Sequence, residues 1–118
     1  MEHPEEVDPL RTFDLSAGRS CEDGRFEAVV LFEQDPMKIR RIELVAGARI
    51  PPCRMAEDAV FVVVEGRVTF RAEGEESVVQ APGALFIPGG AATRSMEAGE
   101  PSLVLAVLCR RPGGPAVS

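Results

Sequence analysis

Cys53 and Met55 are the two side chains of this sequence whose chemistry and spacing most suggest a site. They lie two positions apart in the stretch PPCRMAEDAVFVVVEG, residues 51–66, and on an extended strand both would point into the same space. A thiolate and a thioether suit Cu(I) or zinc better than iron, and Glu57 and Asp58 could add carboxylate oxygens. The alternative is that these side chains line a small, mostly apolar interior without any metal.

Histidine, the usual ligand of transition metals, occurs once in the chain, at His3 in an acidic N-terminal stretch. Centres that hold iron, manganese or nickel with open positions commonly combine several neutral imidazoles with a carboxylate. One chain cannot supply such a site, and a dimer with one histidine from each chain would still supply too few. We therefore expect no histidine-based metal centre and no cofactor.

The composition indicates one soluble domain with an acidic surface. The chain has 118 residues, of which 45% are hydrophobic, and a net charge of -6. Nucleic acids and anionic membranes both select a basic face, so neither is an expected partner. The acidic N-terminal stretch lacks the apolar core of a secretory signal, and the apolar runs are too short to span a bilayer. We expect a cytoplasmic protein.

The cysteines are Cys21, Cys53 and Cys109, an odd number without a C-x-x-C pair. This pattern is typical neither of a disulfide framework nor of a zinc ribbon. We expect three reduced and mostly buried thiols, with Cys53 facing the interior and unreactive for that reason.

Short β-rich segments separated by turns run through the chain, and no amphipathic helix of useful length is evident. Their number and spacing predict an all-β antiparallel sandwich or barrel over residues 13–110, with loosely ordered tails at 1–12 and 111–118. The two segments on either side of Glu65-Gly66 resemble a hairpin. The stretch AGARIPP interrupts the strand pattern. The expected strands are RFEAVVLF (25–32), KIRRIELV (38–45), AVFVVVEG (59–66), RVTFRA (67–72), SVVQ (77–80), ALFIP (84–88), TRSM (93–96) and SLVLAVLC (102–109).

The segment from Arg41 to Arg110 resembles a small single-domain cupin of the conserved-barrel type. The first cupin motif has a glycine, then a His-x-His pair and a glutamate, and then a second glycine. Its spacing is kept in this sequence, while all the ligand residues differ. The matching positions are Gly47, Cys53, Met55, Ala59 and Gly66.

The second cupin motif has a glycine, a Pro-x-Gly turn, a histidine and an asparagine. Here four residues rather than five separate the first glycine from the proline. The matching positions are Gly83, Pro88, Gly90, Thr93 and Glu97. The resemblance implies a double-stranded β-helix, or jelly-roll barrel, whose metal-ligand positions are degenerate.

The resemblance also implies which side chains face the barrel interior. The expected binding residues are Cys53, Met55, Ala59, Phe61 and Thr93, where Phe61 shares the strand face of Ala59. Such an interior suits a small apolar or weakly polar ligand, with Cys53 and Thr93 as its polar contacts. The absence of Trp and Tyr weakens a sugar-binding interpretation.

Three arginines, Arg49, Arg54 and Arg94, flank the expected mouth of the barrel. They would be either solvated rim charges or a clamp for the carboxylate of an acidic ligand. Alternation from Cys53 and Thr93 turns Arg54 and Arg94 outward, which favours rim charges.

The sequence leaves three functions open. The first is a metal-free binding or regulatory module, which we favour. The second is an enzyme with a non-standard metal or thiol site centred on Cys53. The third is a structural dimer module.

A homodimer is expected because the strand at 59–66 is apolar on both faces. With Ala59 inward, Val60, Val62 and Val64 point outward, and the strand at 102–109 is also apolar on both faces. A second chain would cover these side chains. In a monomer, the N-terminal strands would fold across them instead.

Overall fold

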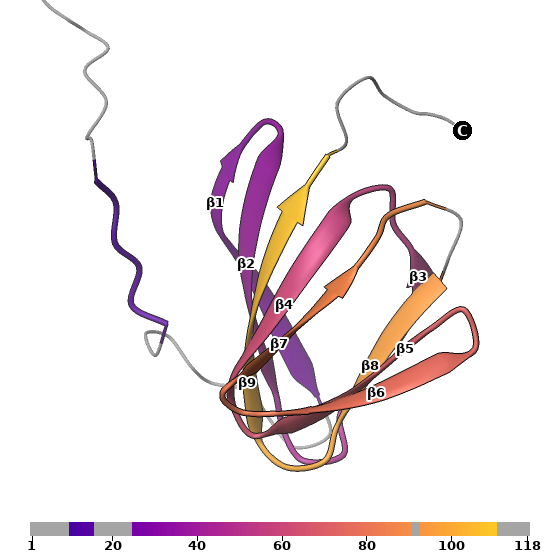
Figure 1. Cartoon of the computed structure of the whole chain (residues 1–118). Coiled ribbons are helices and arrows are strands. Elements are labelled where there is room, and N and C mark those ends of the chain that lie inside the picture. The colour runs from indigo at the N-terminus through magenta and orange to yellow at the C-terminus, as the bar shows by residue number, and fades with distance from the viewer. Residues whose placement is uncertain (1–9, 16–24, 91–92, 111–118) are drawn as a thin grey trace, which may run out of the picture.

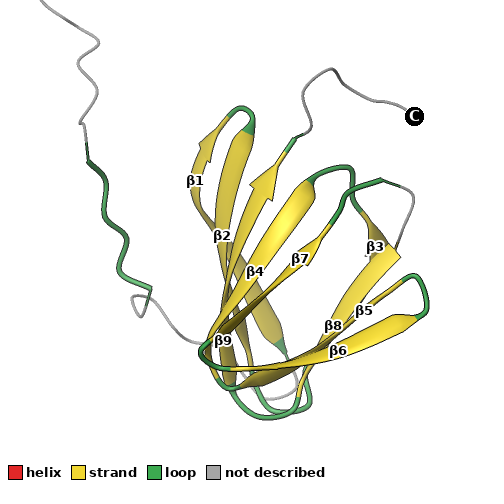
Figure 2. Ribbon diagram, viewed as in Figure 1, coloured by secondary structure: helices red, strands yellow, loops and turns green. Residues whose placement is uncertain are grey.

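The structure, a computed structural model, describes residues 10–15, 25–90 and 93–110, which form strands, turns and loops (Figure 1). No helix occurs in these ranges, so none there is long and apolar enough to cross a membrane (Figure 2). Most of the two predicted tails lies outside the described residues. The strands are β1 (Phe26–Gln34), β2 (Met37–Leu44), β3 (Arg49–Arg54), β4 (Asp58–Glu65), β5 (Arg67–Ala72), β6 (Glu75–Gln80), β7 (Gly83–Ile87), β8 (Thr93–Ala98) and β9 (Ser102–Cys109).

The strands form two antiparallel sheets that face each other, as Figures 1 and 2 show. One sheet has the order β1-β2-β9-β4-β7 and the other has the order β3-β8-β5-β6. Consecutive strands therefore often lie in different sheets, which is the arrangement of a jelly roll. The all-β prediction is confirmed.

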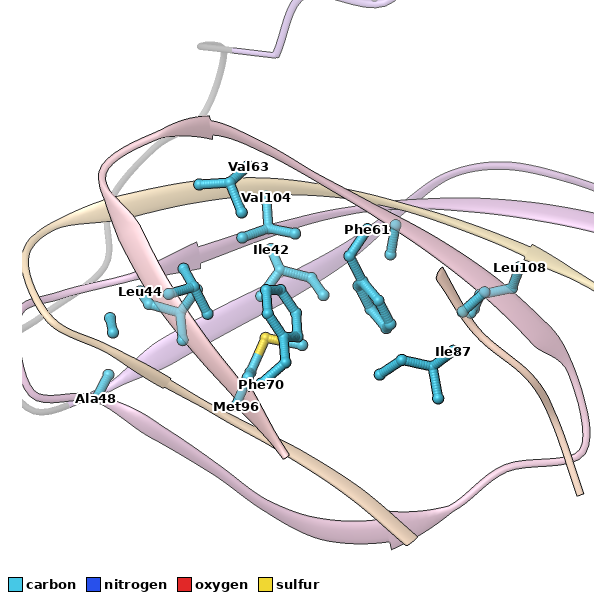
Figure 3. Packing of buried hydrophobic residues seen from close by; sticks show 14 residues of the cluster. Ile42, Leu44, Ala48, Phe61, Val63, Phe70, Ile87, Met96, Val104 and Leu108 are labelled. Atoms are coloured by element: carbon cyan, nitrogen blue, oxygen red, sulfur yellow. The ribbon is translucent and has the colours of Figure 1, made fainter. Parts of the chain in front are cut away.

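Alternation of inward and outward side chains, clearest along β4, builds the core between the sheets. On β4, Ala59, Phe61 and Val63 are at most 5% exposed, whereas Val60 and Val64 are 38% and 37% exposed. The predicted inward and outward faces of this strand are thus confirmed. The larger core side chains meet in the space between the sheets, as Figure 3 shows for Ile42, Leu44, Phe61, Val63, Phe70, Ile87, Met96, Val104 and Leu108.

The predicted hairpin at Glu65-Gly66 is wrong, because β4 and β5 belong to different sheets. Gly66 has φ +87°, which lets the chain turn from one sheet into the other. Ser102 holds this crossing, since its Oγ accepts a hydrogen bond from the Arg67 N–H at 3.1 Å and donates one to the Glu100 carbonyl at 2.7 Å. β5 instead forms a hairpin with β6.

β3 was not expected, because its sequence RIPPCR contains two adjacent prolines. The strand lies at the edge of its sheet and pairs only with β8, and its register shifts between Ile50 and Cys53. Proline is tolerated at such a position because an edge strand needs only half of its backbone hydrogen bonds and a bulge needs fewer still.

β1 and β2 continue the five-stranded sheet beyond β9 and do not fold across its outer face. The monomeric arrangement that would cover this face with the N-terminal strands is therefore wrong. Phe13 touches the end of the face, with its ring 6.3 Å from the ring of Phe32.

Candidate ligand cavity

A cavity of about 280 Å³ lies between the two sheets, at the end where β3 ends and β8 begins. The start of β4 and the end of β7 lie at the same end of the barrel. Its wall is mostly apolar. Phe61, Ile87 and Leu108 lie together near one end of the core in Figure 3. The apolar residues of the wall come from both sheets and include Ile42, Phe61, Phe70, Ile87, Met96 and Leu108.

Cys53 and Met55 both line this cavity, which confirms that they face the same space. Cys53, however, is exposed and Met55 is half-buried, so the thiol lies at the mouth. The expectation of buried cysteines is wrong for Cys53 and Cys109, which are both free and exposed. Cys21 lies outside the described residues. The mouth is open here because β3 is a bulged edge strand, which among the described strands pairs on one side alone.

Ala59 and Phe61 face the interior from β4, but they play different parts. Phe61 lines the cavity, and its ring packs against Phe70 with the ring centroids 5.2 Å apart. Ala59, 1% exposed, is part of the core and not of the cavity wall.

Thr93 is not in the interior, and the expectation that it points inward is wrong. It is exposed and borders a separate surface hollow beside Arg71 and Glu73. The reason is the register of β8, in which Arg54 opposes Thr93 and Cys53 opposes Arg94. Opposed residues in antiparallel strands share a face, so the residue that follows Thr93 shares the face of Cys53.

Arg94 is therefore the inward residue, and the expectation that it points to solvent is also wrong. It is 6% exposed and lines the cavity. The sequence contains a signal for this placement. In TRSMEA the apolar Met96 and Ala98 alternate with Ser95 and Glu97, which assigns the even positions to the core. Matching Thr93 to the cupin histidine obscured that alternation.

The guanidinium of Arg94 is held by backbone carbonyls. Nη1 donates to the Ile87 carbonyl at 3.2 Å and Nη2 donates to the Glu57 carbonyl at 2.8 Å. Nε is buried and has no hydrogen-bond partner in the part of the chain that the structure describes. Burial lowers the pKa of Arg94, an effect that the nearby acidic side chains of Glu57 and Asp58 partly offset.

Two loops that meet at the mouth position this arginine. The Gly89 N–H donates to Asp58 Oδ1 at 2.8 Å, and the Gly90 N–H donates to the Met55 carbonyl at 3.0 Å. A side chain at Gly89 would overlap the backbone of Ala56, so only glycine permits this approach. The Asp58 carboxylate thus fixes the loop and does not line the cavity.

The other rim arginines lie where the sequence predicts. Arg54 is exposed, and Arg49 is exposed and forms an ion pair with Glu97 at 3.4 Å. Neither lines the cavity. Arg40, from the inward face of β2, does line it and was not anticipated.

Comparisons with known proteins bear on the fold. No protein-family model and no curated protein matches the chain. Among solved structures, a cupin-superfamily protein from Desulfitobacterium hafniense has a TM-score of 0.72 at 10% identity, covering 79% of this chain and 84% of its own. An RmlC-like cupin from Desulfovibrio desulfuricans has a TM-score of 0.75 at 19% identity, covering 85% and 96%. The chain has the cupin fold.

A third similar structure carries an enzyme name. It is a putative mannose-6-phosphate isomerase from Ralstonia eutropha, with a TM-score of 0.72 at 26% identity over 86% of this chain and all of that one. The structures that resemble this chain therefore carry different functional names, and the shared fold by itself does not identify a function.

The metal centre that a cupin barrel suggests does not fit this cavity. Among the described residues, no three or more His, Cys, Asp or Glu side chains form a group that could hold a metal ion. The charged side chains that residues 10–15, 25–90 and 93–110 contribute to the cavity wall are Arg40 and Arg94, and both repel a metal cation. Cys53 is the one thiol that the described residues contribute to the wall, and Met55 is a weak ligand beside it.

Proposed function

We propose that this protein is a metal-independent binding module that holds a small, largely apolar molecule in the barrel cavity. The cavity is the observation that carries the proposal. Natural ligand pockets are concave and mostly apolar, with a few polar groups that orient the ligand. The wall has this character, with Cys53, Ser95, Arg40 and Arg94 as its polar members.

The volume sets the size of the ligand. An apolar cavity of about 150 Å³ can hold benzene, so a cavity of about 280 Å³ has room for roughly ten non-hydrogen atoms. A phosphorylated sugar, as the name of the Ralstonia structure would suggest, fits less well. Its hydroxyl groups would be buried against apolar side chains without hydrogen-bond partners, which is costly.

Binding of 1-octanol, measured by calorimetry and by ligand-observed NMR, tests the proposal. We expect saturable binding at one site. Ala106→Leu should abolish it, because Ala106 is 1% exposed, lines the cavity, and would place three further carbon atoms inside it. Ala84→Leu is the matched control, since Ala84 is exposed on β7 outside the cavity. Absence of saturable octanol binding, or equal binding by both variants, would refute a cavity site.

The alternative is an enzyme with a thiol or metal site at Cys53, and the exposed position of this thiol beside Arg94 favours it. Iodoacetamide labelling followed by peptide mass spectrometry separates the two functions. If the protein is a binding module, iodoacetamide should alkylate Cys53 and Cys109 at similar rates, since both thiols are exposed. Labelling of Cys53 more than about tenfold faster, or one tightly bound transition metal per chain, would support the enzyme.

The dimeric assembly and cytoplasmic location expected from the sequence stay predictions. Neither is required for the cavity to bind its ligand.

A further inference from the structure

We propose that Arg94 is an anion anchor and that the natural ligand is a small apolar carboxylic acid. Its carboxylate would bind the guanidinium and its hydrocarbon part would fill the apolar cavity. This inference rests on the proposed binding function and assigns the chemical class of its ligand.

The first support is a buried charge that donates no hydrogen bond to a carboxylate among the described residues. Arg94 is 6% exposed, and its hydrogen bonds go to two carbonyl oxygens and to no carboxylate among the described residues. Buried ions normally pair with an opposite charge, because loss of hydration costs several kcal/mol that carbonyl dipoles repay only in part. A carboxylate ligand would supply a counter-charge that is hydrogen-bonded to the guanidinium directly.

The second support is the pattern of donors on Arg94. The bonds to Ile87 and Glu57 fix both Nη atoms, while Nε has no partner although it is buried. A guanidinium has more N–H groups than these two bonds use. Nε–H and an adjacent Nη–H form a fork that matches the two oxygens of a carboxylate.

The third support is the charge of the cavity wall. Arg40 and Arg94 both line it, whereas no aspartate or glutamate in the described part of the chain does. This is unexpected in a chain with 19 acidic and 13 basic residues. The local excess of positive charge in a low-dielectric space attracts an anion, and the surrounding apolar side chains favour an acid with a hydrocarbon body.

Comparison of octanoate with 1-octanol on the wild-type protein tests the anchor without any substitution. The two probes have similar chains and differ in charge. We expect octanoate to bind at least about tenfold more tightly at pH 7.5, the effect of a charge-assisted pair of hydrogen bonds. In ¹⁵N-resolved NMR spectra, the Arg94 Nε–H signal should shift with octanoate and stay in place with octanol.

Arg94→Met removes the charge at similar volume, and it should erase the preference for octanoate over octanol. Arg49→Met is the matched control, because Arg49 is exposed outside the cavity, and it should keep the preference. If Arg94→Met does not fold, the wild-type affinities and the Nε–H shift still decide the question.

The outcomes separate the two proposals. Equal binding of octanol and octanoate by the wild-type protein would refute the anchor and leave the binding cavity in place. Binding of neither probe would refute both. A preference for octanoate that survives in Arg94→Met would place the anion elsewhere and refute the role of Arg94.

Discussion

Arg94 carries a positive charge into a space that is otherwise lined mainly by apolar atoms. Its orientation follows from its place opposite Cys53 and from its alternation with Met96 and Ala98. Matching Thr93 to the cupin histidine cannot reveal this inward orientation. The motif has five residues between its first glycine and its proline, whereas this chain has four between Gly83 and Pro88. Of the expected binding residues, Cys53, Met55 and Phe61 line the cavity, and their contact with a ligand stays a prediction.

Arg94→Met should leave the ligand-free protein about as stable as the wild type, within roughly 1 kcal/mol. The two carbonyls lose their donor, but the cost of burying an uncompensated charge disappears as well. Urea unfolding followed by circular dichroism measures the difference, since the chain has no Trp or Tyr for fluorescence. A decrease of about 3 kcal/mol or more in the free energy of unfolding would instead show that Arg94 stabilises the fold through its hydrogen bonds to the Ile87 and Glu57 carbonyls.

Strands with a strong pattern of apolar residues could be predicted from the sequence. Strands that depend on their neighbours in the sheet could not. β9 spans the same residues, Ser102–Cys109, as the apolar run in the sequence. β3 was missed because its prolines are compatible only with the edge position and the bulge that tertiary pairing provides. The sequence predicts a hairpin where β4 crosses to β5, because local sequence does not show which strands will pair with each other.

The crossing at Gly66 yields a prediction about the elements it joins. Ser102→Ala should destabilise the protein by about 1 to 2 kcal/mol, because the Arg67 N–H and the Glu100 carbonyl lose their partner in a nearly buried site. Ser77→Ala is the control, since Ser77 is exposed on β6, and it should change stability by less than about 0.5 kcal/mol. Equal urea midpoints for the two variants would contradict a structural role for Ser102.

At the scale of the whole molecule, an apolar row crosses the outer face of the five-stranded sheet. The register sets Phe32 beside Ile39, Ile39 beside Val107, Val107 beside Val60, and Val60 beside Phe86. The part over β4 and β7 is the open one, with Val60 38% and Phe86 58% exposed. This surface is where the homodimer predicted from the sequence would form.

Val62→Arg should split such a dimer, because Val62 lies on the same outer face between Leu105 and Ala84 and a charge there would be stranded in the contact. Val78→Arg is the matched control, being exposed on β6 in the other sheet. Light scattering at micromolar concentration should give a dimer for the wild type and control and a monomer for Val62→Arg. A monomeric wild type would contradict the prediction.

The central claim, an apolar cavity with an inward arginine that binds a carboxylic acid, is tested most directly by a crystal structure of the protein with octanoate. The predicted result is a carboxylate within about 3 Å of the Arg94 guanidinium, with the hydrocarbon chain against Phe61, Ile87 and Met96. A cavity filled by the protein's own side chains, or Arg94 turned to solvent with no acid inside the barrel, would contradict it.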